Sequence, residues 1–404
     1  TVGLDDLARV MTVGEAKLPA DYRIWSVRLA SALFGVAIIL TVYAVLLSAK
    51  FKPVAAAAVA TLVAFETAFI DQFRAAQLDA FQIEFALVCV GFTIAAARRG
   101  VGRPRVLPLA GAGAAAGAAM MVKLDGALLA AGPATLLLMS LAPRWKSTRS
   151  WTVTIFEGSV FTLALIGVVA SVYCVQTLWC RQPLDFGSPA AAVDARFMST
   201  TYQHYLDGRR PWSPVVVGAV MRDSAAFMLN DQAGIGLSDP NGSSPWLQPF
   251  GVKPINYRWD SQHGITRYVQ LIANPVNWML SAAGLVTALL LVAAGGLTRR
   301  GEQRGEVIRQ LAPIVAMAMA FYLAHGVLGA HRVMYLYHHF LPELLGVLCL
   351  PFLARDLAQR APRWRGRLEV ASWGVIVASA AAFLWFAPLV YHRPLTHQSC
   401  ELRN

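Results

Sequence analysis

The stretch RVMYLYHHFLPELLG, residues 332–346, places one arginine, two histidines and one glutamate where a long apolar segment begins. An arginine at the centre of a membrane-spanning helix costs about 2.5–3.5 kcal/mol on insertion scales, so ionisable residues in such segments mark functional sites by default. Whether this stretch opens a membrane span depends on the pattern of the rest of the chain.

The whole chain has the composition of a polytopic membrane protein. Of its 404 residues 56% are hydrophobic and only 14% are charged, whereas soluble domains average about 25% charged residues. The net charge of +12 does not indicate a nucleic-acid partner, because the basic residues alternate between loops instead of gathering on one soluble face. We therefore expect the lipid bilayer, and no nucleic acid, as a partner.

We predict an all-α polytopic membrane protein with a bundle of about ten transmembrane helices and one long outer loop domain. The expected spans are 28–48, 53–71, 79–97, 106–121, 124–142, 152–179, 276–297, 309–330, 335–354 and 369–390. They divide the chain into an outer N-terminal segment (1–27), a six-span module (28–179), an outer loop-rich domain (180–275), a four-span module (276–391) and an outer tail (392–404).

Basic residues concentrate in alternate short connections between these spans. Those connections hold Lys50, Lys52, Arg98, Arg99, Arg103, Arg105, Arg144, Lys146, Arg149, Arg299, Arg300, Arg304, Arg309, Arg355, Arg360, Arg363, Arg365 and Arg367. The other short connections hold one base each, namely Arg74, Lys123 and Arg332. The positive-inside rule places the rich set in the cytoplasm, so the three lone bases, residues 180–275 and both chain ends face outside.

The three lone bases are candidates for binding an anion at the outer membrane boundary. Guanidinium and ammonium groups suit the phosphate of a lipid-linked donor. The alternative is that each base reaches the lipid headgroups by itself, while the aspartates beside them cap helices or form local ion pairs. The adjacent His338 and His339 point to different sides of a helix, so we expect at most one of them to face a site.

The sequence predicts no metal site. The five cysteines (Cys89, Cys174, Cys180, Cys349 and Cys400) have no metal-ligand spacing, and a disulfide involving Cys174, Cys180 or Cys400 stays open. The outer segment 180–275 is rich in Trp, Tyr, Pro, Gly and Asn, with no strong helix or strand period in its later part. We expect a loop-rich cap on the membrane surface, whose aromatic side chains bind sugar or anchor in the interface.

Four stretches, in chain order, resemble the motifs of protein O-mannosyltransferases, members of the GT-C class of polyprenyl-phosphate-dependent glycosyltransferases. They are VRLASALFG (27–35), RAAQLDAF (74–81), SPWLQPF, KPINY and GITRYVQLIANPVNW within 244–278, and YHHFLPELL (337–345). The resemblance implies eleven spans with the N-terminus inside, which agrees with the ten spans predicted here if the first span of the family is missing.

The resemblance implies transfer of mannose from a polyprenyl phosphate to Ser or Thr hydroxyls of exported proteins, without a cofactor. It places the chain in a bacterial inner membrane, active side facing the periplasm or exterior, with a translocon as a further partner. The expected donor-phosphate residues are Arg74, Lys123, Arg332, His338 and His339, and the expected acceptor or sugar residues are Asp79, Trp246, Arg267 and Asn274.

The family also carries an acidic pair, Asp-Glu, whose aspartate is taken as the catalytic base, and this motif is not seen here. Asp5 and Asp6 form the acidic pair near the corresponding place and are expected as a surrogate base, with helix capping as the alternative. Three other functions stay open: a GT-C transferase acting on lipid A or a cell-wall glycan, a catalytically inactive paralogue, and a transporter. No convincing internal repeat favours the transporter.

Overall fold

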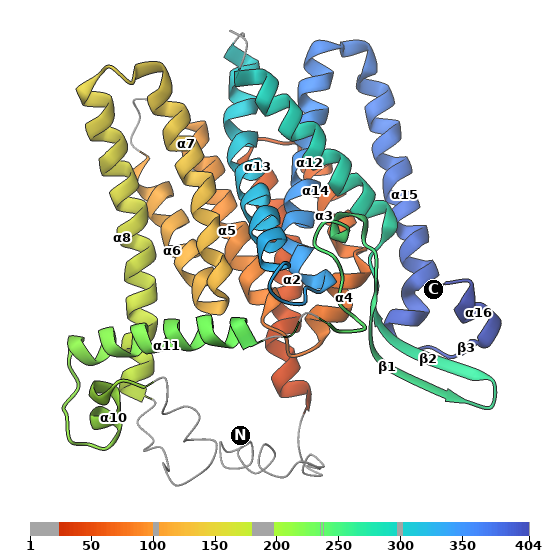
Figure 1. Ribbon diagram of the computed structural model, residues 1–404. Helices are drawn as coiled ribbons and strands as arrows, with labels where there is room; N and C mark the ends of the chain where they lie inside the picture. The colour runs from red at the N-terminus through yellow and green to blue at the C-terminus, as the bar shows by residue number, and fades with distance from the viewer. Residues whose placement is uncertain are drawn as a thin grey trace.

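The computed structural model describes residues 24–99, 105–179, 198–234, 236, 238–296 and 302–403. Its helices form a bundle in which α8 lies at one edge and α15 at the opposite edge (Figure 1). The first half of the bundle contains α2 (Ile24–Ser48), α3 (Pro53–Ala64), α4 (Thr67–Arg74), α5 (Asp79–Arg98), α6 (Val106–Val122), the 3-10 helix η1 (Leu124–Ala130), α7 (Ala131–Leu141), η2 (Ala142–Arg144) and α8 (Thr148–Trp179).

The second half contains α12 (Pro275–Gly296), α13 (Glu302–Leu328), η4 (Leu336–His339), α14 (Phe340–Arg360), η5 (Pro362–Trp364) and α15 (Arg365–Val390). Among the described residues, seven helices are long and apolar enough to cross a membrane, and α3 with α4 makes an eighth if that bent pair is one span. The other two expected spans are also helical: α6 is apolar but has only 17 residues, and α14 includes four charged residues. The predicted membrane bundle is confirmed.

The segment predicted as one span over 53–71 is bent by 64° between α3 and α4. The bend lies at Glu66, whose side-chain carboxylate accepts a hydrogen bond from the backbone N–H of Ala68 at 3.3 Å and so caps α4. A carboxylate at the N-cap satisfies N–H groups that a helix start leaves without partners, which favours a new helix over a continuous one.

Helix α6 consists largely of glycine and alanine, and these small residues allow it to pack directly against α8. A Cβ atom on Gly113 would stand 2.1 Å from the backbone oxygen of Phe161, so only glycine permits this approach. Arg105, which we counted with the cytoplasmic loop bases, is instead buried at the start of α6. Its Nε donates to Glu157 Oε1 at 3.0 Å and its Nη1 to Ser140 Oγ at 2.8 Å, so it ties α6 to α7 and α8.

Smaller elements gather at one end of the bundle, with α11 running across it (Figure 1). They are α10 (Thr200–Leu206), α11 (Pro214–Gly234), η3 (Gln248–Phe250), β1 (Ile255–Gln262), β2 (Ile265–Leu271), β3 (Leu395–Thr396) and α16 (His397–Glu401). β1 pairs antiparallel with β2, and β2 pairs antiparallel with β3.

The hairpin is a regular element within residues 244–278, where we found no strong helix or strand period and expected a loop-rich cap. Most of β1 is exposed on both faces, and a strand without a buried face lacks the alternation of apolar and polar residues that reveals strands in a sequence. The boundaries 180 and 275 of the predicted outer domain stay a prediction, and residues 180–197 lie outside the described residues.

One apolar core runs through both halves of the bundle. It includes Leu87 and Leu136 from the first half and Phe321 and Phe340 from the second, all of them buried. Helix α13 packs against α5, α7 and α14. This packing brings the start of α5, the end of α13 and the start of α14 together, at the end of the bundle that carries the hairpin.

Candidate active site

A small hollow lies where α5, the α6–η1 connection, α13 and η4 meet. Its volume is about 20 Å³, room for about one water molecule. The polar side chains that line it are Asp79, Gln82, Lys123, Asp125, His325, Tyr337 and His338. Because these residues come from four separate segments, the hollow exists only in the folded bundle.

Lys123 lies at the mouth of this hollow and is held by Asp79. α6 ends at Val122, and Lys123 follows in an extended conformation. Its Nζ lies 2.5 Å from Asp79 Oδ1, and 30% of the lysine side chain but only 7% of the aspartate side chain is exposed. The other carboxylate oxygen of Asp79 accepts from Gln72 Nε2 at 2.8 Å, and Gln72 Oε1 accepts from the hydroxyl of Tyr257 at 2.6 Å. A chain of hydrogen bonds therefore runs from the hairpin to the lysine.

Asp125 is held by two side chains from neighbouring helices. Gln82 donates its amide N–H to Oδ1 of Asp125, and Nε2 of His325 lies 3.2 Å from Oδ2. The side chain of Asp125 is 28% exposed and that of His325 is 6% exposed, so a buried ring orients an accessible carboxylate. Our sequence interpretation did not assign Asp125, Gln82 or His325; an ionisable His325 inside an apolar span was the signal available.

The two adjacent histidines lie in different surroundings. His338 lines the hollow, and its ring stacks on Tyr337 with 4.5 Å between centroids. Its Nδ1 lies 3.0 Å from both the backbone nitrogen and the backbone oxygen of Tyr335, and the tautomer determines which of the two it bonds. His339 is 5% exposed, and its ring centroid lies 5.6 Å from that of Trp278.

Arg74 and Arg332 are not among the residues that line the hollow. Nη2 of Arg74 donates to the backbone oxygen of Val390 at 2.7 Å and to Asp71 Oδ1 at 3.1 Å, so this arginine joins α4 to the end of α15. Nε of Arg332 donates to the backbone oxygen of Val333 at 3.3 Å. Of the three lone bases, the structure therefore places only Lys123 in the hollow.

Comparisons with known proteins match both halves of the chain. A family model described as the C-terminal four TMM region of protein-O-mannosyltransferase matches residues 223–404. A second, described as dolichyl-phosphate-mannose-protein mannosyltransferase, matches residues 15–156. The chain belongs to the protein O-mannosyltransferase family. It is thus a multi-pass membrane glycosyltransferase that transfers mannose from a lipid-linked donor to protein.

A solved structure supports the fold of this mannosyltransferase, and a second is similar over part of its length. The Saccharomyces cerevisiae protein O-mannosyltransferase Pmt1-Pmt2 complex bound to the sugar donor superposes with a TM-score of 0.72 at 12% identity, covering 95% of this chain and 81% of that one. The oligosaccharyltransferase AglB from Archaeoglobus fulgidus, in complex with an inhibitory peptide and a dolichol-phosphate, reaches a TM-score of 0.47 at 14% identity, covering 92% and 45%. Among curated proteins, no sequence matches the chain.

A second polar group of the mannosyltransferase lies in the bundle interior, and we call its four residues the buried joint: Glu66, Asn274, Asn277 and Ser379. Oε1 of Glu66 accepts from the backbone N–H of Asn274 at 2.9 Å, and Oε2 accepts from Asn277 Nδ2 at 3.1 Å. Nδ2 of Asn274 also donates to the backbone oxygens of Phe65 at 2.9 Å and Ser379 at 3.0 Å. The joint thereby ties the bend between α3 and α4 to α12 and α15.

The remaining predicted site residues that the structure describes do not share one location. Asp79 lies in the hollow and Asn274 in the buried joint. Trp246 is 53% exposed, with its ring edge against Tyr322 at 5.5 Å between centroids, and Arg267 lies in β2 opposite Asp260. Asp5 and Asp6 lie outside the described residues. Cys174 and Cys400 are free thiols, while Cys180 also lies outside the described part of the chain.

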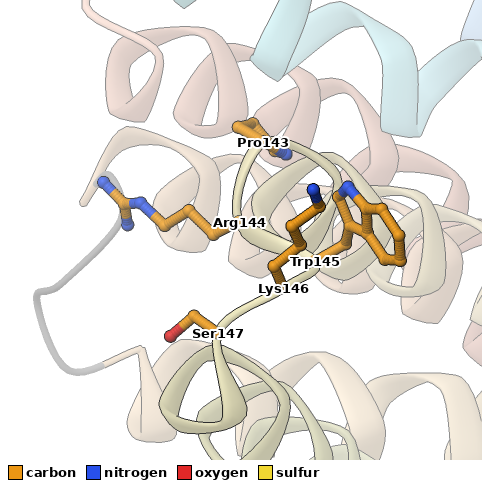
Figure 2. A pocket seen from close by; sticks show the side chains of 5 residues that line it. All are labelled: Pro143, Arg144, Trp145, Lys146 and Ser147. Carbon is orange, nitrogen blue, oxygen red and sulfur yellow. The ribbon is translucent and has the colours of Figure 1, made fainter.

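Another hollow, of about 380 Å³, is formed by the five consecutive residues Pro143–Ser147 between α7 and α8. Figure 2 shows Arg144 extending away from Lys146 and Trp145 in this turn. It carries no carboxylate or histidine, and it lies at the opposite end of η1 and α7 from Lys123. The smaller hollow is therefore the candidate active site.

Proposed function

We propose that Lys123 binds the phosphate of a polyprenyl-phosphate mannose, and that mannose is transferred at the mouth of the hollow to a Ser or Thr hydroxyl of an exported protein. The observation that carries this proposal is the partly exposed side chain of Lys123, whose ammonium pairs with the buried carboxylate of Asp79. A hollow of about 20 Å³ is too small for a sugar, so the donor binds at its open side.

The chemistry places clear demands on the groups around the sugar. The bond between the anomeric carbon and the phosphate oxygen breaks, and its electron pair leaves with the polyprenyl phosphate. The hydroxyl oxygen of the acceptor forms the new bond and gives up its proton to a carboxylate, for which we propose the pair Asp5 and Asp6. Lys123 stabilises the charge of the departing phosphate, and His338 supplies a second hydrogen-bond donor in the tautomer that carries the proton on Nε2.

Arg74 and Arg332 serve in this proposal as basic residues that attract the anionic donor towards the outer boundary. Trp246 and Arg267 belong to the acceptor side in this proposal. The predicted roles of His339 at the phosphate and of Asn274 at the acceptor are not kept, because both side chains are buried. The resemblance to bacterial members of the family favours a bacterial inner membrane, and the charge bias of the loops supports an orientation in which the hollow faces the periplasm. An exported protein is the acceptor, a translocon is a further partner, and no cofactor is required besides the donor.

Purified Lys123→Ala tests the proposal, with Lys52→Ala as the matched control that removes a cation at the start of α3. We expect Lys123→Ala to lose affinity for sugar-free polyprenyl phosphate and to transfer mannose about 100-fold more slowly or worse, ~3 kcal/mol. Lys52→Ala should match the wild-type protein in both. Wild-type affinity and rate in Lys123→Ala would overturn the assignment of Lys123 to the donor phosphate. If labelled mannose appeared only in the lipid fraction, the proposal that the acceptor is a protein would be overturned.

A further inference from the structure

Asp125 is an accessible carboxylate whose orientation is set from two sides. Gln82 on α5 holds one oxygen and His325 on α13 holds the other, although His325 is 200 residues away in the sequence. An ionised carboxylate has about four acceptor positions, so these two contacts leave capacity for further hydrogen bonds. A side chain fixed by helices rather than by loops is held precisely enough to select a ligand.

The position of Asp125 relative to Lys123 limits what it can contact. Leu124 alone separates the two residues, and both side chains line the same hollow. In a direct displacement the attacking hydroxyl and the leaving phosphate lie on opposite faces of the anomeric carbon. A carboxylate beside the phosphate-binding lysine therefore lies along the sugar on the phosphate side, and is poorly placed to take the proton of the attacking hydroxyl.

We propose that Asp125 accepts hydrogen bonds from hydroxyl groups of the donor sugar and thereby determines which sugar is transferred, with Gln82 and His325 as positioning residues. The inference rests on the proposed binding of the donor phosphate at Lys123. A site built to bind a hydroxyl rejects an analogue without it, because its buried polar groups are then left without partners.

A set of polyprenyl-phosphate mannose donors, each lacking one sugar hydroxyl, tests this inference on the purified full chain. In the wild-type protein, removal of a hydroxyl that Asp125 binds should lower kcat/KM by about 10- to 100-fold, the range for a hydrogen bond to a charged group. In Asp125→Asn the same donor should be used nearly as well as the complete one. Affinity for sugar-free polyprenyl phosphate should stay within about twofold of the wild-type value.

Two outcomes would overturn the inference. In the first, Asp125→Asn discriminates against every deoxy donor as strongly as the wild-type protein does. In the second, Asp125→Asn loses affinity for sugar-free polyprenyl phosphate, as Lys123→Ala is expected to do. Gln82→Met, of similar size, serves if Asp125→Asn does not fold: it should weaken the preference at the same hydroxyl and leave the affinity for the sugar-free lipid unchanged. Failure of the phosphate proposal is recognised separately, by retained affinity for that lipid in Lys123→Ala.

Discussion

The hollow at Lys123 and the buried joint at Glu66 use similar chemistry with opposite access to solvent. In each, carboxylates are held by side-chain amides next to a break between helices. Glu66 and Asn274 are at most 1% exposed, whereas about a third of the side chains of Lys123 and Asp125 is exposed, at 30% and 28%. The buried polar groups of the joint hydrogen-bond to one another, while the partly exposed groups of the hollow keep hydrogen-bonding positions free for a ligand.

The energetic consequence differs accordingly. A buried donor or acceptor left without a partner costs about 1–3 kcal/mol, because its desolvation is no longer offset. Substitutions in the joint should therefore lower stability and spare the activity of the molecules that remain folded. Substitutions of the partly exposed groups at the hollow should lower activity more than they lower stability. Three pairs of variants separate these outcomes.

The largest effect beyond that of Lys123 is expected in the joint, from Asn274→Ala. This change removes the side-chain donor that bonds the backbone oxygens of Phe65 and Ser379 and leaves Glu66 and its partners around a small cavity, so the free energy of unfolding should fall by about 2–4 kcal/mol. Chemical denaturation in mild detergent measures it. Asn230→Ala removes an amide that bonds the backbone oxygen of Ala226 on the exposed side of α11 and should change stability by about 0.5 kcal/mol or less. Equal losses of stability in the two variants would contradict the special role of the buried joint.

The adjacent histidines give the next test. His338→Ala should lower the rate of mannosyl transfer about tenfold, the loss of one hydrogen bond to a charged group, with little change in stability. His339→Ala removes a buried ring beside Trp278 and should lower stability by about 2–3 kcal/mol, with turnover per folded molecule preserved. Activity and denaturation are measured in parallel on both variants. Equal losses of rate and of stability in the two variants would contradict the functional role assigned to His338.

The smallest effect is expected from Tyr257→Phe, which breaks the first link of the hydrogen-bond chain to Lys123. The rate should fall about threefold, since one neutral hydrogen bond is lost. Burial, and then the nearby charge of Asp71, raises the pKa of Tyr257 above its ordinary value of 10. The hydroxyl therefore stays protonated, and the ratio of wild-type to variant rates should be constant between about pH 6 and 9.

The sign of the stability effect follows from the same shift. Because the pKa is higher in the folded protein, the contribution of Tyr257 is fully present below about pH 10 and is lost as the pH rises through the raised value. Tyr268→Phe, on the neighbouring strand β2, is the matched control and should leave the rate unchanged. If the ratio of wild-type to variant rates changed well below pH 10, another group in the hydrogen-bond chain to Lys123 would be titrating.

Much of the fold could be predicted from single segments. The ten expected spans are helical, and the charge bias of the loops separated Lys123 from the bases at the other end of the bundle. Lys123 and Asp79 were also singled out before their contact was known. The hairpin β1–β2 was missed because its exposed strand has no buried face, and the bend at Glu66 was missed because one cap interrupts an otherwise continuous apolar pattern.

The sequence by itself determined the membrane spans, the charge asymmetry and the family. A bilayer acts on each segment separately, through the transfer free energy of its side chains, so local composition is sufficient. Only the tertiary structure decided that Asp125 meets His325, that Asn274 lies in a closed joint, and that Arg74 binds the end of α15. The partners of a polar group inside a bundle depend on how distant helices pack, and that packing cannot be recovered from one segment at a time.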